Sequence, residues 1–434
     1  MVGMEVVNRL LTSIPLPQMV PVRQRFDDTH ITDVPSAVWW ACDQGGVRSR
    51  IMPGARVAIG VGSRGIANLP VLVKAVVDVV KAVGAHPFIV PAMGSHGGAT
   101  AEGQQAMLEH LGVTESRVGA PILSTMEVVE RGRLESGLPL YVDKYAAGAD
   151  GIILINRIKP HTSFRGPIES GLQKMMVIGL GKQKGADSAH ALGFEHMAAR
   201  LSELSNVFIA NLPFLFGLAI LENAYDQTAK VATILPEQLQ DEEPRLLNEA
   251  RQLMPRILLN PLDVLVIDEI GKDISGTGMD PNITGRFSND LIKGDLTVSR
   301  IAVLGLTDRS DGNATGLGLA DTTTVRLEQS IDRGKGYMNA LTSTSMPAAK
   351  LPMVLDTDRL AIQACIKTSL APDLKNVRMV RIQNTLRLHH IFISTALLNE
   401  ATEHRGVEVL GPPRPLSFDA SGKLCDEFQS GTDG

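Results

Sequence analysis

Three largely apolar runs, at 55–62, 86–92 and 149–158, are each followed by a polar, glycine-rich segment. The first two are followed by predicted helices at 69–85 and 101–112, and further strands are predicted at 206–211, 218–224 and 230–236. Strand, glycine-rich turn and helix in succession predict a largely parallel sheet, which binds ligands at the carboxyl ends of its strands. The sequence therefore predicts an α/β fold with a site at that edge.

The chain of 434 residues is longer than one hydrophobic core usually requires, and the strand pattern begins again at 262–270 and 299–306. We expect two α/β domains, each with a largely parallel sheet flanked by helices, and an active site in the interdomain cleft. The predicted bounds are 1–260 for an N-terminal catalytic domain, 261–410 for a smaller C-terminal domain and 411–434 for a tail. The tail is expected either to pack on the N-terminal domain or to fray.

The composition of the chain limits the classes of molecule that it is expected to bind. The formal net charge of -5 and the aromatic content of 4% provide neither the basic field nor the stacking platforms that nucleic-acid binding uses. The cysteines, Cys42, Cys365 and Cys425, form no CxxC pair and fit a reducing compartment. No stretch reaches roughly 18 uninterrupted apolar residues and no export signal is evident, so we expect a cytoplasmic protein that acts on a small molecule. The sequence is also compatible with a homo-oligomer.

Four side chains suited to proton transfer or metal binding follow the predicted strands: His96, His161, Lys174 and His190. Histidine transfers protons near neutral pH and binds borderline metals through its imidazole, so two histidines could serve as acid and base and one as a metal ligand. A single His in a glycine-rich loop is structural or merely exposed roughly two times in three. His96 and His161 favour chemistry because both follow strands of one sheet.

Three further features of this region have alternative interpretations. His196 is predicted to lie on the same helix as His190 but on another face, as a surface or packing residue. The segment GLGKQKG resembles a phosphate-binding loop, yet it is neither a Walker A sequence nor a GxGxxG. In GVGSRGIAN, backbone amides at a helix N-terminus and Arg64 would suit a phosphate, and Arg64 as a solvated loop charge is an equal alternative.

The motifs KPHTSFRG and GLQK with the later histidine, set beside GSRG and GSHGG, resemble the nickel-dependent lactate racemase family. In that family, as the resemblance implies, a lysine is joined covalently to a nicotinate-derived mononucleotide. This nickel-pincer nucleotide holds nickel through two sulfurs and a carbon, and a histidine is the fourth ligand. The cofactor accepts and returns a hydride while two other histidines act in turn as base and acid, so that a hydroxyl-bearing carbon is inverted.

Matched motif by motif, the resemblance implies that Lys174 is the tethering lysine and that His190, sixteen residues later, is the nickel ligand. His161 and His96 look like the paired acid and base. Arg64 looks like the arginine that meets the cofactor phosphate, with Ser63 and Gly65 beside it. The candidates for substrate contacts, each more often an ordinary loop charge, are Arg165, Asp280, Arg286 and Arg309.

Departures from the family pattern point to a substrate other than lactate. The segment from His161 to Lys174 is longer and lacks a paired glycine before the lysine, and Val61 stands where an acidic residue is expected. In the second domain, Gly285 and Ser288 stand near the places of a glutamine and a lysine. The resemblance thus implies a racemase or epimerase of a 2-hydroxy acid or a sugar acid. The alternatives are a redox or lyase reaction on the same scaffold and a non-catalytic nucleotide or metabolite sensor.

Overall fold

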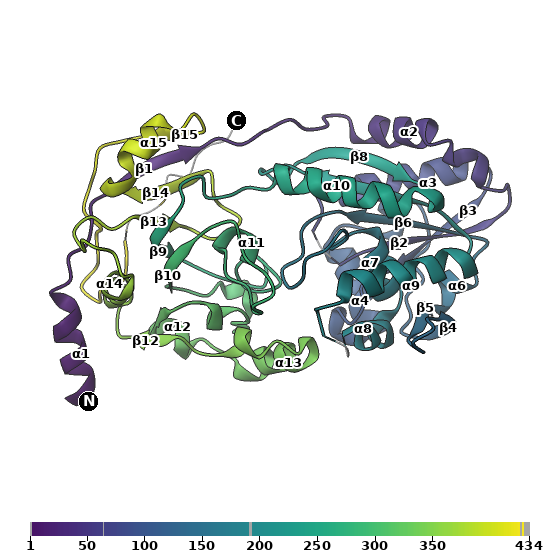
Figure 1. Cartoon of the computed structure of the whole chain (residues 1–434). Helices are drawn as coiled ribbons and strands as arrows, with labels where there is room; N and C mark the ends of the chain where they lie inside the picture. Colours follow the sequence, from purple (N-terminus) through teal and green to yellow (C-terminus); the bar gives the residue numbers. More distant parts are fainter. Residues whose placement is uncertain (1, 64, 191–192, 426–427, 429–434) are drawn as a thin grey trace. The chain divides into compact units, whose positions relative to one another are not determined.

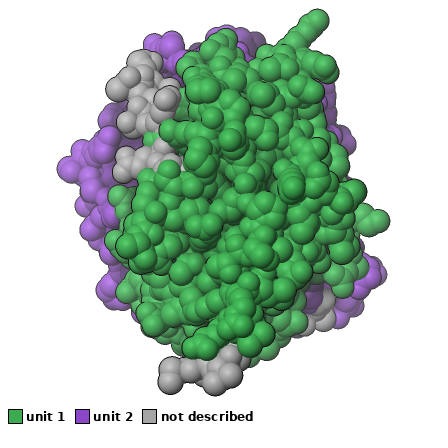
Figure 2. All heavy atoms as spheres, turned by 90° about the vertical axis from the view of Figure 1, so that its left-hand side faces the viewer, with its two compact units in different colours: residues 1–26, 255–434 green, residues 27–254 purple. Residues whose placement is uncertain are grey.

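The computed structural model describes residues 2–63, 65–190, 193–425 and 428, and of residues 2, 3, 190 and 342 the backbone alone. The chain divides into two compact units, which are coloured separately in Figure 2. Unit 1 combines Met1–Phe26 with Pro255–Gly434, and unit 2 is the continuous segment Asp27–Met254. Each unit has its own mixed, largely parallel sheet flanked by helices (Figure 1). The predicted α/β class is confirmed.

The sheet of unit 2 has five strands in the order β3-β2-β6-β7-β8. Its strands are β2 (Arg56–Val61), β3 (His86–Pro91), β6 (Gly151–Arg157), β7 (Phe214–Glu222) and β8 (Thr228–Ile234). β2 pairs in parallel with β3 and β6, and β6 with β7, whereas β8 is antiparallel. The strands β4 (Val128–Arg133) and β5 (Pro139–Asp143) form a separate two-stranded sheet.

Alternating side chains of this sheet build two cores. Val57 and Ile59 of β2 pack on one face with α2 and α3, and Ala58 on the other with α9 and α10. The helices of unit 2 are α2 (Val34–Gln44), η1 (Val47–Arg50), α3 (Leu69–Ala82), η2 (Gly97–Ala99), α4 (Ala101–His110), α5 (Glu115–Val118), α6 (Lys144–Ala147), α7 (Leu172–Lys174), η3 (Met175–Gly179), α8 (Lys182–His190), α9 (Met197–Asn211), η4 (Pro236–Gln238) and α10 (Leu239–Leu253). The region predicted as a strand at 206–211 is therefore helical.

The sheet of unit 1 has eight strands in the order β12-β11-β10-β9-β13-β14-β1-β15. These are β1 (Met19–Gln24), β9 (Leu262–Ile267), β10 (Val298–Val303), β11 (Thr322–Thr324), β12 (Met353–Leu355), β13 (Met379–Ile382), β14 (His390–Ser394) and β15 (Val407–Val409). Its helices are α1 (Val2–Thr12), α11 (Pro281–Thr284), η5 (Asp308–Ser310), η6 (Leu317–Leu319), α12 (Val325–Gln329), α13 (Arg333–Ser343), η7 (Met346–Ala349), α14 (Asp358–Thr368), η8 (Thr395–Leu397) and α15 (Leu398–Glu403). The five strands β9 to β13 are parallel, and β14, β1 and β15 are antiparallel to their neighbours.

Both ends of the chain lie in unit 1, whereas the sequence analysis assigns the N-terminal segment to the first domain. β1 is an inner strand between β14 and β15, and Val20 and Val22 are fully buried there. The tail packs on the core of unit 1 through Leu416, Phe418 and Leu424. Pairing between segments so far apart in the chain leaves no local pattern, which is why the sequence did not predict it.

Candidate functional site

The loops that carry the predicted site residues leave neighbouring strands of unit 2 at one edge of its sheet. Ser63 follows β2, His96 follows β3 and His161 follows β6, and these three strands are parallel. Because β3 and β6 lie on opposite sides of β2, the chain order reverses there. The carboxyl ends of strands beside such a reversal are where open α/β sheets bind their ligands.

His96 lies in a glycine-rich loop between β3 and α4. The amide of His96 donates to Met93 O at 3.1 Å, and Nδ1 of its exposed ring is hydrogen-bonded to Ser63 Oγ in the loop after β2. Gly97, with φ = 67°, lies so close to α4 that a Cβ atom there would be 2.6 Å from Gly103 C. Only glycine permits this left-handed turn and close approach, which together bring His96 over the end of β2.

The loop of His161 is closed and has a buried acid at its centre. Lys159 and Ser170 exchange backbone hydrogen bonds of 3.0 and 3.2 Å at its base. Inside the loop, the buried Glu169 accepts from His161 N at 2.6 Å, from Arg165 Nη1 at 3.2 Å and from Arg251 Nη2 at 2.6 Å. One carboxylate thus fixes the backbone at His161 and binds two guanidinium groups.

The His161 ring is held on its Nδ1 side. Ser163 N donates to His161 Nδ1 at 3.0 Å, so the neutral ring carries its proton on Nε2. The Phe164 ring lies 4.4 Å from the His161 ring and stacks on Phe194, 6.4 Å away at an interplanar angle of 13°. Because Phe194 belongs to the connection between α8 and α9, the His161 loop contacts the segment that follows His190.

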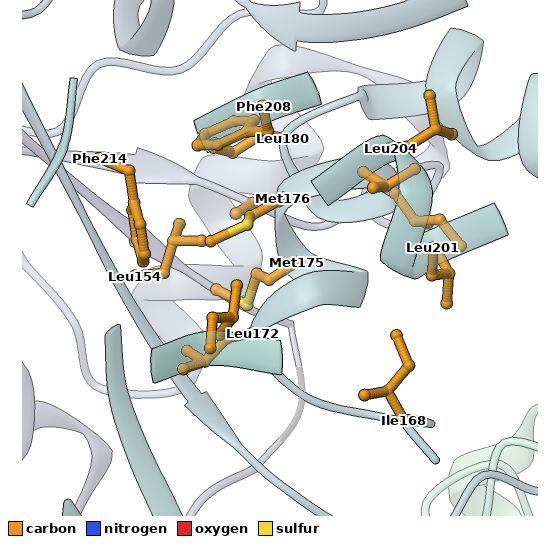
Figure 3. Packing of buried hydrophobic residues seen from close by; sticks show 14 of the residues in the cluster. Leu154, Ile168, Leu172, Met175, Met176, Leu180, Leu201, Leu204, Phe208 and Phe214 are labelled. Atoms are coloured by element: carbon orange, nitrogen blue, oxygen red, sulfur yellow. The ribbon is translucent and has the colours of Figure 1, made fainter. Parts of the chain in front are cut away.

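Lys174 is the last residue of α7, immediately before the π-helical turn η3. Its side chain is half-buried, whereas its neighbours Leu172, Met175 and Met176 are buried in the core (Figure 3). Asn156 Nδ2, at the end of β6, donates to Gly171 O at 2.8 Å and holds the start of the turn. The backbone before Lys174 is therefore held by a hydrogen bond, and the residues after it are held by burial in the core.

Two glycines bring the loops of Ser63 and His96 against the turn that carries Lys174. A Cβ atom at Gly62 would lie 3.7 Å from Met175 Sδ. Gly94 N donates to Gly179 O at 3.0 Å. The structure thus brings together Ser63, His96 and the Lys174 turn, and the His161 loop follows β6 beside them. Gly65 is exposed, with nothing within 4 Å of the position of a Cβ atom.

Three predictions fall on or near residues that are not fully described. Arg64 lies outside the described residues, and so does the side chain of His190, although its backbone is the last residue of α8. The prediction that His196 shares a helix with His190 is wrong, since His196 is the N-cap of α9. The predicted helix is broken here because Gly193, with φ = 70°, lies between α8 and α9.

The remaining substrate candidates lie in unit 1 or in the His161 loop. Asp280 caps α11, its Oδ1 accepting from Asn282 N at 2.9 Å. Arg286 is paired with Asp321 and donates to Ser299 O at 2.7 Å and Leu319 O at 3.2 Å, so the fold itself engages its guanidinium. Arg309 is exposed in η5. Arg165 is half-buried and donates to His161 O at 2.7 Å.

Glu169, Asn156 and Arg251 have positioning contacts that the sequence analysis missed. Asn156 is a polar residue near the end of the predicted strand at 149–158. Glu169 is the one acid in the loop that also contains Lys159 and Arg165. A single acidic residue in a loop with two basic ones was the sequence signal that could have pointed to Glu169. Arg251 had none, because it reaches the loop from the distant helix α10.

The described part of the chain contains neither a cluster of metal-binding side chains nor a helix that could span a membrane. No three or more His, Cys, Asp or Glu side chains among the described residues gather in a way that could hold a metal ion. Within the same residues, no helix has both the length and the apolar character needed to cross a membrane.

The chain is similar to one protein family and to several solved structures, two of which are described below. Residues 49–202 match the family model described as Lactate racemase N-terminal domain. No curated protein matches the chain. A solved Thermotoga maritima structural genomics target is 14% identical, with 60% of this chain and 69% of that chain covered and a TM-score of 0.45. The lactate racemase apoprotein from Thermoanaerobacterium thermosaccharolyticum is 13% identical, with 82% and 86% covered and a TM-score of 0.45.

Proposed function

We propose that this chain is a racemase or epimerase that inverts a hydroxyl-bearing carbon of a 2-hydroxy acid or a sugar acid, because residues 49–202 match the family model described as Lactate racemase N-terminal domain. The observation that carries the proposal is the meeting of Ser63, His96 and the Lys174 turn at one sheet edge, with His161 on the adjoining loop. Inversion through a planar intermediate requires a group that exchanges the hydroxyl proton on each side of the reacting carbon, and His96 and His161 lie on two different loops.

The described residues fit a nucleotide tethered to Lys174. The lysine is half-buried on an anchored turn, and Gly62, next to that turn, leaves the space that a Cβ atom would fill. In the proposal, Lys174 forms the tether, His190 ligates nickel, and Ser63, Arg64 and Gly65 surround the phosphate. When bound, the nickel-pincer nucleotide would supply the hydride chemistry that amino-acid side chains lack.

The protein's own part is to hold the substrate oxygen and move its proton. In the proposal, His96 exchanges that proton through Nε2, because its Nδ1 meets Ser63 Oγ. His161 takes up a proton only when its ring leaves the contact with Ser163 N, because a neutral ring whose Nδ1 accepts a backbone N–H already carries its proton on Nε2. Glu169 supports this by fixing the backbone of the His161 loop from within. Arg309 is the proposed contact for the substrate carboxylate, since Arg286 is engaged by Asp321 and Arg165 by Glu169. An active site in the interdomain cleft and a cytosolic setting stay predictions.

The proposal is tested by intact mass and nickel content after expression beside the cofactor-making enzymes. We expect an added nucleotide-sized mass and about one nickel per chain, both lost in Lys174→Ala because the tethering amine is gone. Lys184→Ala is the matched control, since Lys184 is an exposed lysine of α8 close in sequence.

Loaded protein is then screened for stereochemical exchange of hydroxy acids and sugar acids. Retention of adduct and nickel in Lys174→Ala would contradict the proposed tether. Tight metabolite binding by loaded protein without turnover would favour the sensor, and stoichiometric release of a ketone would favour a redox reaction.

A further inference from the structure

The first of the two lysines in the GLGKQKG segment is buried and binds protein groups rather than facing outward as a phosphate ligand would. Lys182, the first residue of α8, has a fully buried side chain. Its Nζ donates to Pro91 O and to Gln104 Oε1, the latter at 2.8 Å, and lies 3.2 Å from Asp143 Oδ2. Lys182 also adopts φ = 55°, which is unfavourable for a residue with a Cβ atom. Such strain persists only where surrounding contacts over-determine it.

The contacts of Lys182 enclose the loop that carries His96. Pro91 is the last residue of β3 and Gln104 lies in α4, so the ammonium binds both ends of the connection. The amide of Gln104 extends the network inward: Nε2 donates to Gly94 O at 2.9 Å and to His96 O at 3.2 Å. A chain of hydrogen bonds therefore runs from Lys182 through Gln104 to the backbone of His96.

Asp143 completes the network from the opposite side. It ends β5, and its Oδ1 accepts from Tyr145 N at 2.8 Å and Ala146 N at 3.1 Å at the start of α6. Burial lowers the pKa of Lys182 and raises the pKa of Asp143, and each charge opposes the shift of the other. Removing one partner of such a buried ion pair destabilises the protein strongly, whereas replacing both partners together destabilises it much less.

We propose that Lys182 is a positioning residue that holds the His96 loop, through Gln104, in the geometry in which the His96 ring meets Ser63. The inference rests on the proposed function only for the catalytic role of His96. α8 begins at Lys182 and ends at His190, so the same helix start also places the proposed nickel ligand. Lys182 thereby ties the proton-transfer loop to the cofactor segment.

Two variants separate this role from general packing. Gln104→Met removes the hydrogen bonds to Gly94 O and His96 O and the one from Lys182, while it keeps the Lys182–Asp143 pair. The double variant Lys182→Met, Asp143→Asn removes both charges together, and Asn still caps α6. Gln105→Met is the matched control, because the exposed Gln105 is the next residue of α4 and its amide donates only to Glu109 in the described structure.

Amide hydrogen exchange is measured first, because it requires neither substrate nor cofactor. We expect residues 93–100 to exchange about tenfold faster in both variants, as loss of a buried hydrogen bond predicts, and the His96 ring nitrogen resonances to move. Once a substrate is found, kcat should fall about tenfold or more with little change in KM. Unchanged exchange at 93–100, or an increase spread evenly over 27–254, would overturn the inference whatever the chain catalyses.

Discussion

Glu243 of α10 is a fully buried carboxyl beneath the turn that carries Lys174. Its Oε2 accepts from Gln173 N at 3.1 Å, and a Cβ atom at Gly171 would lie 2.0 Å from Oε1. Burial raises the pKa of Glu243 to about 7, against hydrogen bonds from Gln173 and Leu172 that lower it. The carboxyl therefore titrates near neutral pH in the folded state.

This raised pKa makes the stability of unit 2 depend on pH. Below the unfolded pKa near 4.5 both states are protonated, whereas between 4.5 and 7 the folded state retains its proton longer. The free energy of unfolding therefore falls as the pH rises through this window, by at most about 3 kcal/mol. Glu243→Gln removes the titration, so we expect the variant to gain stability over the parent between pH 5 and pH 8.

Thermal unfolding of unit 2 at pH 5 and pH 8 measures this gain. Glu242→Gln is the control, because Glu242 lies on the same helix and forms a surface pair with Arg245. We expect that control to change stability by less than about 0.5 kcal/mol at either pH. An effect of Glu243→Gln that is equal at the two pH values would exclude a raised pKa.

Buried charges also mark the limit of the sequence analysis for single residues. Ser63, His96 and the Lys174 turn could be predicted to converge because each follows a strand of one parallel sheet. The burial of Lys182 and Glu169 could not be predicted, because charged residues in glycine-rich segments are usually exposed. Their burial depends on partners such as Asp143 and Arg251, which come from distant elements.

The π-helical turn η3 links Lys174 to the His96 loop. π-type turns occur disproportionately at functional sites, and here the last residue, Gly179, packs against the end of β3. A Cβ atom at Gly179 would lie 2.8 Å from Ala92 O and 3.1 Å from Met175 Cγ. Since the first of these is backbone, the neighbouring segment must move if a side chain is added.

We expect Gly179→Ala to destabilise unit 2 by about 1–3 kcal/mol and to displace the His96 loop. Thermal unfolding gives the stability, and amide exchange at 93–100 reports the loop. Gly336→Ala is the control, because a Cβ atom at this helical glycine of α13 would meet nothing within 4 Å. There the same change is expected to be neutral or stabilising by up to about 1 kcal/mol. Equal effects of the two substitutions would refute the packing argument.

Elements with a strong periodic pattern could be predicted, and those defined by tertiary contacts could not. β2, α3 and β3 follow their apolar patterns closely. The run at 206–211 has the composition of a buried strand, yet Leu201, Leu204 and Phe208 repeat at helical spacing and place it in α9. α8 has the opposite character, since KQKGADSAH offers little apolar pattern, and its first residue is held by buried polar contacts.

The two units differ in how the chain forms them. Unit 2 is continuous from Asp27 to Met254, whereas unit 1 needs Met1–Phe26 in addition to Pro255–Gly434. β1 supplies an inner strand with Met19, Val20 and Val22 buried against β14 and β15. At about 1.5–3 kcal/mol for each buried side chain, the loss of this strand approaches the whole stability of a typical domain, about 5–15 kcal/mol.

We therefore expect residues 27–254 to fold when expressed alone, and residues 255–434 alone to fail. Circular dichroism and the dispersion of amide proton resonances distinguish the two outcomes. Joining 1–26 to 255–434 through a flexible linker should restore folding of unit 1, because the missing strand returns with its register to β14 and β15. The matched control carries Val20→Asp and Val22→Asp in the linked chain, which keeps its length but places charges at two fully buried positions. A well-dispersed spectrum from 255–434 alone would mean that β1 is dispensable and that unit 1, like unit 2, is encoded by one continuous segment.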